Sequence, residues 1–207
     1  MVLQVCNKTQ FIKIIPRLKR LKIACRVPKV LDDFFLLNAF YRLEHLELVS
    51  VLNMKFQGLR LPNLRSLRID RCDRISIDSP KLQTLSCDPL DALEVKHPLT
   101  ITELEIDRGY LKGETLVRFQ NVTIFKIKIS SPFLPDDVSI LTALPKLKEL
   151  RLVVESKSLK LYEESWRSLV DSLIDERASR RRDLRLFFGG HLLEGDKRFD
   201  DYDFKKE

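Results

Sequence analysis

The chain has 207 residues, of which 44% are hydrophobic and 32% charged, a balance typical of a folded protein rather than a disordered one. No apolar run approaches the roughly 20 residues of a membrane-spanning helix, and the N-terminus lacks a secretory pattern because basic residues interrupt its apolar runs. The net charge of +7 arises in residues 1–31, which hold eight basic and no acidic residues, so it does not mark the whole chain as a nucleic-acid binder.

A short motif, Leu-x-x-Leu-x-Leu or a close variant, recurs along the chain, often just after a proline. Its middle residue falls at positions 21, 46, 67, 85, 104, 125 and 150, and a degenerate copy, Leu184-x-Leu186, places the last one near 184. The steps are therefore 18 to 25 residues, and about 34 for the last. This period predicts a leucine-rich repeat solenoid of seven to eight repeats over residues 1–194.

Each motif reads as a short strand, because side chains two residues apart point to the same face. Leu67 and Ile69 would face inward, and Ser66 and Arg68 outward. Stacked repeats bury the inward row, and each enclosed Leu or Ile contributes about 1.5–3 kcal/mol. We therefore expect an irregular α/β solenoid with a parallel concave sheet and a convex side of mixed loops and helices.

Repeat length predicts the structure of the segment after each strand. The repeats between residues 46 and 125 are too short for a full helix and should return through loops or short extended pieces. Helical spacing predicts helices at 30–42, 136–144 and Glu163–Arg180, the last with Trp166 on its apolar face and acting as part of a C-terminal cap. Residues 195–207 lack periodicity and are expected to form a charged, frayed tail.

The N-terminal end and the cysteines suggest the setting of the chain. Leu3-x-Val5 resembles the tail of a repeat strand, which favours a truncated form or a fragment of a longer protein. The cysteines form no C-x-x-C pair and have no histidine at ligand spacing, so we expect buried reduced thiols, no metal site and a cytoplasmic or nuclear location: Cys6, Cys25, Cys72 and Cys87. Cys72 follows a strand at a position where a small side chain turns inward.

The sequence gives little support for a catalytic site. The histidines His45, His97 and His191 lie in different repeats, and no nucleophile elbow or glycine-rich phosphate loop is present. The paired carboxylates at 136–137 and 200–201 read as a helix cap and part of the tail. We therefore expect a non-enzymatic protein without a cofactor.

The outward positions form two rows across the predicted strands. One row runs Lys22, Glu47, Arg68, Ser86, Glu105, Lys126, Arg151, Arg185, and the other runs Arg20, His45, Ser66, Thr84, Glu103, Ile124, Glu149, Asp183. Neighbouring residues of a row predict two charge ladders, Lys22–Glu47–Arg68 and Glu105–Lys126. Such pairs either keep the sheet soluble, at about 0.2–1 kcal/mol each, or form a recognition surface.

We take these rows as the candidate protein-binding site, with Lys22, His45, Glu47, Arg68, Glu103, Glu105, Lys126 and Arg151 as its residues. An alternative is RNA or phosphoinositide binding through the basic N-terminal stretch and residues 180–182. Aromatic residues do not interleave with these basic residues, so nucleic acid stays the less favoured partner.

The repeat phrases resemble the leucine-rich repeats of F-box proteins from about Leu18 to Leu186; they are RLKRLKI, FYRLEHLEL, LPNLRSLRIDRCDRI, SPKLQTLSCD and LPKLKELRL. In that family the repeats hold a substrate protein, and a separate F-box binds the adaptor of a cullin-RING ubiquitin ligase. The resemblance thus implies the substrate-binding part of a ligase receptor. This chain shows no F-box, so the adaptor would be a partner only if an F-box lies upstream. Intracellular immune-type receptors and scaffolds carry similar repeats, which leaves a ligand-sensing role as an alternative.

Overall fold

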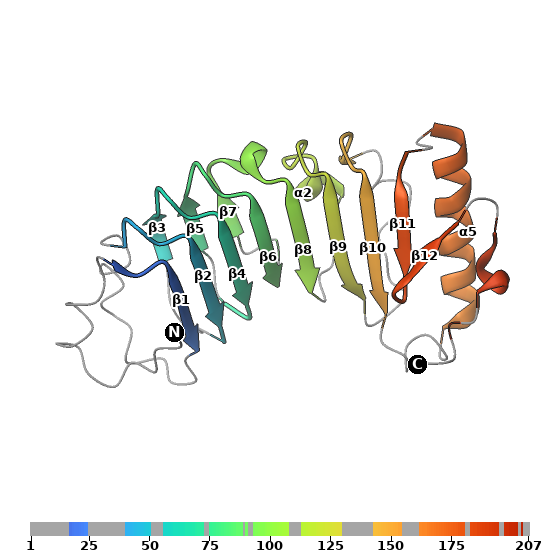
Figure 1. Cartoon of the computed structure of the whole chain (residues 1–207), viewed down its shortest axis with the longest axis horizontal. Coiled ribbons are helices and arrows are strands. Elements are labelled where there is room, and N and C mark those ends of the chain that lie inside the picture. Colours follow the sequence, from blue (N-terminus) through green and yellow to red (C-terminus); the bar gives the residue numbers. More distant parts are fainter. Residues whose placement is uncertain are drawn as a thin grey trace. The chain divides into compact units, whose positions relative to one another are not determined.

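The computed structural model describes residues 17–24, 40–50, 56–72, 75–88, 90, 93–107, 113–129, 143–154, 162–180, 183–194, 197–202 and 204 (Figure 1). The chain divides into two compact units, Met1–Ile101 (unit 1) and Thr102–Glu207 (unit 2). Within each unit, parallel strands stack in a solenoid-like arrangement, which confirms the predicted architecture at this level.

The described strands of unit 1 belong to two parallel sheets. The motif strands form the first sheet, in the order β1 (Arg20–Ala24), β2 (His45–Val49), β4 (Ser66–Asp70) and β6 (Thr84–Asp88). The segments between them form the second sheet, in the order β3 (Phe56–Arg60), β5 (Ile75–Asp78) and β7 (Leu93–Val95). The prediction that short repeats return through extended pieces is therefore confirmed for these three segments.

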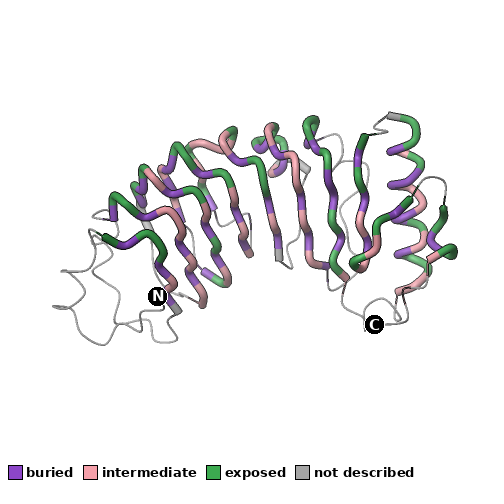
Figure 2. Tube along the Cα trace, viewed as in Figure 1, coloured by how far each residue is buried: buried purple, intermediate pink, exposed green. Residues whose placement is uncertain are grey.

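The motif residues of unit 1 lie directly opposite one another. Leu21 pairs with Leu46, Leu46 with Leu67 and Leu67 with Leu85, in the register that the repeat spacing predicts. All four side chains are almost fully buried, and burial alternates along each strand (Figure 2). A buried row shared by adjacent strands fixes the register, because a slip by one residue would expose it.

A recurring turn leads into β2, β4 and β6. The amides of Leu43, Leu64 and Leu82 donate to the carbonyl three residues earlier, at 3.0, 3.1 and 3.2 Å. The residues that carry these carbonyls are buried, and they are Phe40, Leu61 and Ser79. Ser79 thus occupies a position that is apolar in the two preceding repeats. Within the described part of the chain, its buried hydroxyl has no hydrogen-bond partner.

The two described cysteines, Cys72 and Cys87, are buried reduced thiols, as expected. Cys72 turns inward after β4, and its Sγ lies 3.6 Å from the Asp70 carbonyl oxygen and 3.9 Å from that of Leu48. This small side chain therefore faces two strand-end carbonyls, as its position in the motif predicts. Cys87 belongs to the inward row, opposite Ile69.

Unit 2 also contains parallel motif strands, but its last two strands pair antiparallel. Its strands follow the order β8 (Glu103–Asp107), β9 (Ile124–Ile129), β10 (Glu149–Val154), β11 (Arg185–Phe188) and β12 (His191–Leu193). All neighbours are parallel except β11 and β12, which form an antiparallel hairpin. Gly189 and Gly190 connect them with φ of 53° and 86°, the pair of positive angles that a tight primed hairpin turn requires.

The described residues of unit 2 form two helices. The short helix α2 (Gly113–Leu116) falls in the repeat between β8 and β9. The long helix α5 (Glu163–Arg180) has the predicted bounds. Its predicted apolar face is buried, with Trp166 fully enclosed and its ring centroid 5.8 Å from that of Phe188. The two helices predicted at 30–42 and 136–144 fall almost wholly outside the described residues, and so do Leu3, Val5, Cys6 and Cys25.

The described part of the expected tail is not frayed, so that prediction is wrong there. Phe199, in the 3-10 turn η6 (Phe199–Asp201), is buried, and its ring centroid lies 5.8 Å from that of Phe188. Phe204 lies 5.0 Å from Phe188 by the same measure. Two aromatic side chains thus anchor an otherwise charged segment through apolar burial.

The register predicted for the last repeat is also wrong, by two residues. Leu186, not Leu184, lies opposite Leu150, and Phe188 lies opposite Leu152. The inward side chains Leu184, Leu186 and Phe188 alternate with outward ones, so period-two spacing alone permits either register. In the outward rows, Arg185 therefore lies opposite Glu149 and Phe187 opposite Arg151.

None of the described helices combines the length and the apolar character that crossing a membrane requires.

The stacking predicts a contrast between two adjacent residues of β6. Leu85 is fully buried between neighbouring strands, whereas Ser86 faces outward beside Arg68. Leu85→Asp would leave an unpaired buried charge and should lower the free energy of unfolding by about 3–5 kcal/mol. Ser86→Asp, the matched control, should change it by less than about 0.5 kcal/mol. Thermal melts followed by circular dichroism compare the two, and an unchanged melt for Leu85→Asp would contradict the register.

Ser79 provides a second test of the packing. Because its buried hydroxyl lacks a partner among the described residues, Ser79→Ala removes a desolvated polar group and should raise the free energy of unfolding by about 1 kcal/mol. Ser76→Ala, at a half-buried position of β5, is the control and should have little effect. Urea denaturation measures both, and a destabilised Ser79→Ala protein would show that the hydroxyl has a partner.

Candidate functional site

The outward side of the first sheet in unit 1 carries the first predicted charge ladder. Glu47 Oε1 lies 2.7 Å from Lys22 Nζ and 3.9 Å from Arg68 Nε, so one carboxylate links three strands. All three side chains remain partly open to solvent. The ladder Lys22–Glu47–Arg68 is therefore confirmed as a surface feature.

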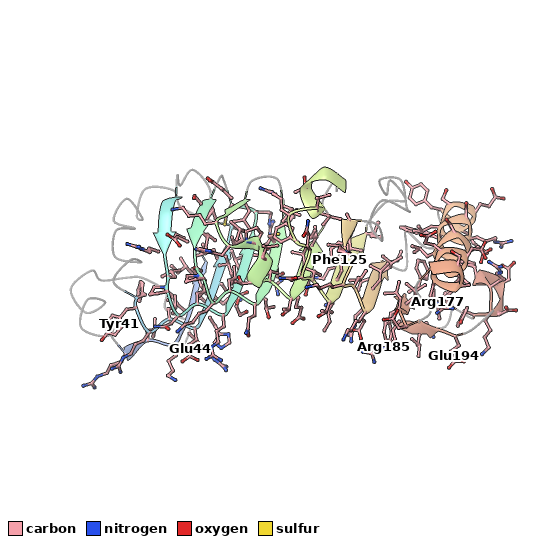
Figure 3. The ribbon with its side chains drawn as sticks, turned by 90° about the horizontal axis from the view of Figure 1, so that it is seen from above. Tyr41, Glu44, Phe125, Arg177, Arg185 and Glu194 are labelled. Atoms are coloured by element: carbon pink, nitrogen blue, oxygen red, sulfur yellow. The ribbon has the colours of Figure 1, made fainter. Side chains whose placement is uncertain are left out.

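A second row accompanies this ladder. His45 lies opposite Arg20 on one side and Ser66 on the other, as predicted. Just before β2, Glu44 pairs with Lys19 at 2.9 Å, and this hydrogen bond lowers the pKa of the Glu44 carboxyl. Glu44 points to the side of unit 1 opposite the return strands (Figure 3). Charged and polar side chains thus cover the open side of this sheet.

The strands of unit 2 carry the second predicted ladder. Glu105 Oε2 lies 3.4 Å from Lys126 Nζ, as predicted, and Glu105 Oε1 lies 3.4 Å from Lys128 Nζ. Lys128 was missed in the sequence, although it follows Lys126 by two residues and so shares its face. Glu103 lies exposed at the start of β8, opposite Ile124. One carboxylate again holds two cations.

The third cluster involves a carboxylate that is almost wholly buried on this outward side. Only 3% of the Glu149 side chain is exposed, because Arg151 and Arg185 cover it. Arg185 Nη2 lies 2.7 Å from Glu149 Oε2, and Arg151 Nε hydrogen-bonds to Glu149 Oε1. The Arg151 guanidinium also lies 5.0 Å from the centroid of the Phe187 ring. The contacts of Arg185 and Phe187 were not predicted from the sequence, because the predicted register of the last repeat was wrong by two residues.

These three clusters share one pattern: one carboxylate pairs with two cations. The cations come from both flanking strands at Glu47, from one neighbouring strand at Glu105, and from its own strand and the next at Glu149. Each cluster therefore carries a net positive charge and retains N–H donors beyond those that one carboxylate engages. The arrangement can bind hydrogen-bond acceptors and anions. The predicted site residues fall within unit 1 (Lys22, His45, Glu47, Arg68) and within unit 2 (Glu103, Glu105, Lys126, Arg151).

His97 and Cys87 belong to residue types that often perform catalysis, and both occupy structural positions. His97 Nε2 lies 3.1 Å from Asp78 Oδ1, in a cluster with Arg60 and Lys96 at the ends of the return strands. Burial raises the pKa of the Cys87 thiol far above its ordinary value, so this thiol stays protonated and is a poor nucleophile. Within the described ranges, no three His, Cys, Asp or Glu side chains gather to hold a metal ion.

No protein-family model, curated protein or solved structure shows significant similarity to this chain.

The Asp78 cluster predicts a pH dependence of stability. The His97 hydrogen bond, supported by Lys96, lowers the pKa of Asp78 below its ordinary value of 3.8. The ionised carboxyl therefore stabilises the fold above that value, and the contribution is lost as the pH falls through the lower folded-state pKa. Asp78→Asn should lower the free energy of unfolding at neutral pH, and its difference from the parent should narrow in acid.

Urea unfolding across a pH series measures this difference. Glu94→Gln, which removes an exposed carboxyl from the neighbouring strand β7, is the control and should cost little at any pH. A difference between Asp78→Asn and the parent that stays constant into acid would contradict the ionic role of Asp78.

Proposed function

We propose that this chain is a non-enzymatic protein-recognition module and that its partner binds the outward rows of the motif strands. The observation that carries this proposal is the set of carboxylates at Glu47, Glu105 and Glu149, each bridged to two cations. The bridges hold charged side chains of neighbouring strands in fixed positions while their outer surfaces stay open to solvent.

Folding alone gives a weak reason for such ladders. Exposed ion pairs contribute about 0–1 kcal/mol, so most of these charges add little to stability. Pre-positioned charges do more for a complex, because complementary charges speed association and exclude wrong partners. Keeping the sheet soluble is the simpler role, and photocrosslinking separates it from recognition.

The repeat motif and the solenoid-like stacking support a leucine-rich repeat protein within this proposal. The resemblance of its repeat phrases to those of F-box proteins supports a substrate-binding role in a ubiquitin ligase receptor. A ligand-sensing region of an immune-type receptor, or a scaffold, would use the same open side of the strands. All of these readings have a protein as the partner.

The alternative of phosphate binding has a weaker basis in the described residues. Lys19 and Lys22, two of the basic residues between 1 and 31, already pair with Glu44 and Glu47. Binding of RNA or phosphoinositide through several cations would weaken steeply as salt rises. A salt titration therefore separates that alternative from protein recognition.

Site-specific photocrosslinking tests the proposal. A photoreactive amino acid at Ser86, on the outward side of β6, should give a discrete protein adduct in cells. The same amino acid at Ser76, half-buried on the return strand β5, is the matched control and should give none. Glu47→Lys should reduce the Ser86 adduct, because it replaces the carboxylate that bridges Lys22 and Arg68 with a like charge.

Two results would contradict protein recognition at this surface. Equal adducts at Ser86 and Ser76 would mean that the outward rows have no special role. An adduct at Ser86 that nuclease treatment removes would favour the RNA alternative.

A further inference from the structure

The buried carboxylate of Glu149 needs charged hydrogen-bond donors, which two neighbouring arginines supply. A carboxylate removed from water costs several kcal/mol unless charged hydrogen-bond donors compensate it. Arg151 and Arg185 supply those donors from β10 and β11. In this arginine pair, one buried carboxylate orients two guanidinium groups on the open side of the sheet.

The two arginines remain available to a ligand although Glu149 holds them. Their side chains are 49% and 63% exposed, for Arg151 and Arg185 respectively. Each guanidinium has five N–H donors in a planar fork that suits carboxylate groups. Anchoring these long side chains in advance reduces the conformational entropy that binding would otherwise cost.

Apolar side chains lie beside the arginine pair on the same face of the sheet. Phe187 lies opposite Arg151, and Leu192 lies opposite Phe187 across the hairpin. Leu192 is 42% exposed, and Val153, two residues after Arg151, is 37% exposed. Aromatic and arginine side chains together are typical of the residues that contribute most energy to protein interfaces.

The charge of this face selects the kind of partner. The outward positions of β9, β10 and β11 hold four basic residues and one acidic residue, namely Lys126, Lys128, Arg151, Arg185 and Glu149. Because Glu103 and Glu105 of β8 lie beside the strand that carries the two lysines, the positive excess lies at Arg151 and Arg185. The remaining outward side chains of these strands are apolar, at Ile124, Val153 and Phe187. A complementary partner must therefore combine negative charge with apolar side chains.

We infer that the surface formed by Arg151, Arg185, Phe187, Leu192 and Val153 binds an acidic, partly apolar segment of a partner protein. A carboxylate of that segment pairs with the two arginines, and a neighbouring apolar side chain packs on Phe187 and Leu192. This inference rests on the proposed recognition function and names the class of partner for unit 2.

A phosphate backbone fits this surface less well. Sequence-independent phosphate binding depends on the number of cations that are free to replace counterions. Here Glu105 and Glu149 neutralise two of the four positive charges, so a phosphate backbone would release fewer counterions than at four uncompensated cations. The exposed Leu192 and Val153 would gain nothing from a strongly hydrated phosphate.

Selection of short random peptides displayed on phage, using the full chain as bait, tests the inference. The enriched peptides should carry Asp or Glu within a few residues of an aromatic or leucine side chain. Synthetic, fluorescein-labelled copies are then titrated by anisotropy. Arg185→Gln and Leu192→Ser should each weaken their binding by roughly 10-fold, the effect of removing a central interface contact.

Leu192→Ser protects the test against a folding artefact. Arg185→Gln removes a partner of the buried Glu149, whereas Leu192→Ser changes an exposed side chain and leaves both Glu149 contacts in place. Fluorescence of Trp166, the only tryptophan, reports whether each variant is folded. Arg60→Gln, on the return strand β3 and outside the outward rows, is the matched control and should bind the peptides like the parent. Arg68→Gln serves as a comparison that tests the outward row of unit 1.

Several outcomes would overturn the inference. Enrichment of basic peptides, or of no peptides, would do so, as would acidic peptides that bind folded Leu192→Ser and Arg185→Gln like the parent. Binding that depends on Arg68 instead would overturn this surface and leave the proposed function standing. Absence of an adduct at Ser86 would count against the proposed function and not against the peptide result.

Discussion

The inward row of apolar side chains, shared in register by adjacent motif strands, is the constraint on which each unit depends. A strand of five residues cannot bury two or three leucines alone, so its stability comes from the strand beside it. In unit 1 this row aligns Leu21, Leu46, Leu67 and Leu85. Because side chains alternate, the same register decides which residues meet on the opposite face. The core therefore determines the arrangement of the surface.

The surface clusters follow from that register and from a simple inequality of charge. Two cations and one carboxylate meet at each of the three clusters, so one positive charge in each cluster remains unbalanced. Where the carboxylate stays partly exposed, as at Glu47 and Glu105, the ion pairs contribute little to folding. Where it is buried, as at Glu149, losing one arginine would leave a desolvated charge with half its compensation. The cluster around Glu149 is therefore the one in which fold stability and surface chemistry are most strongly linked.

Much of this arrangement could be predicted because its signals are local. Period-two leucines fix the strands, and a consistent apolar face fixes Glu163–Arg180. The last register escaped prediction because Leu184 mimics a motif residue, and the error hid the contacts of Arg185 and Phe187. The order of the tail was not predicted because its charged composition masks Phe199 and Phe204, whose packing depends on the distant Phe188. Long-range packing, which no local pattern records, accounts for both failures.

The end of parallel stacking in unit 2 also explains how its candidate surface arises. The edge beyond β11 would expose unpaired backbone groups, and the antiparallel β12 covers it through the Gly189–Gly190 turn. The α5 residue Arg177 secures that strand, because its Nη1 donates to the Leu193 carbonyl at 2.7 Å. In an antiparallel pair, opposed residues point to the same side, so burying Leu193 against Leu186 places Leu192 beside Phe187 on the open face. The same hairpin that closes the edge thus supplies the apolar half of a surface whose charged half comes from β10 and β11.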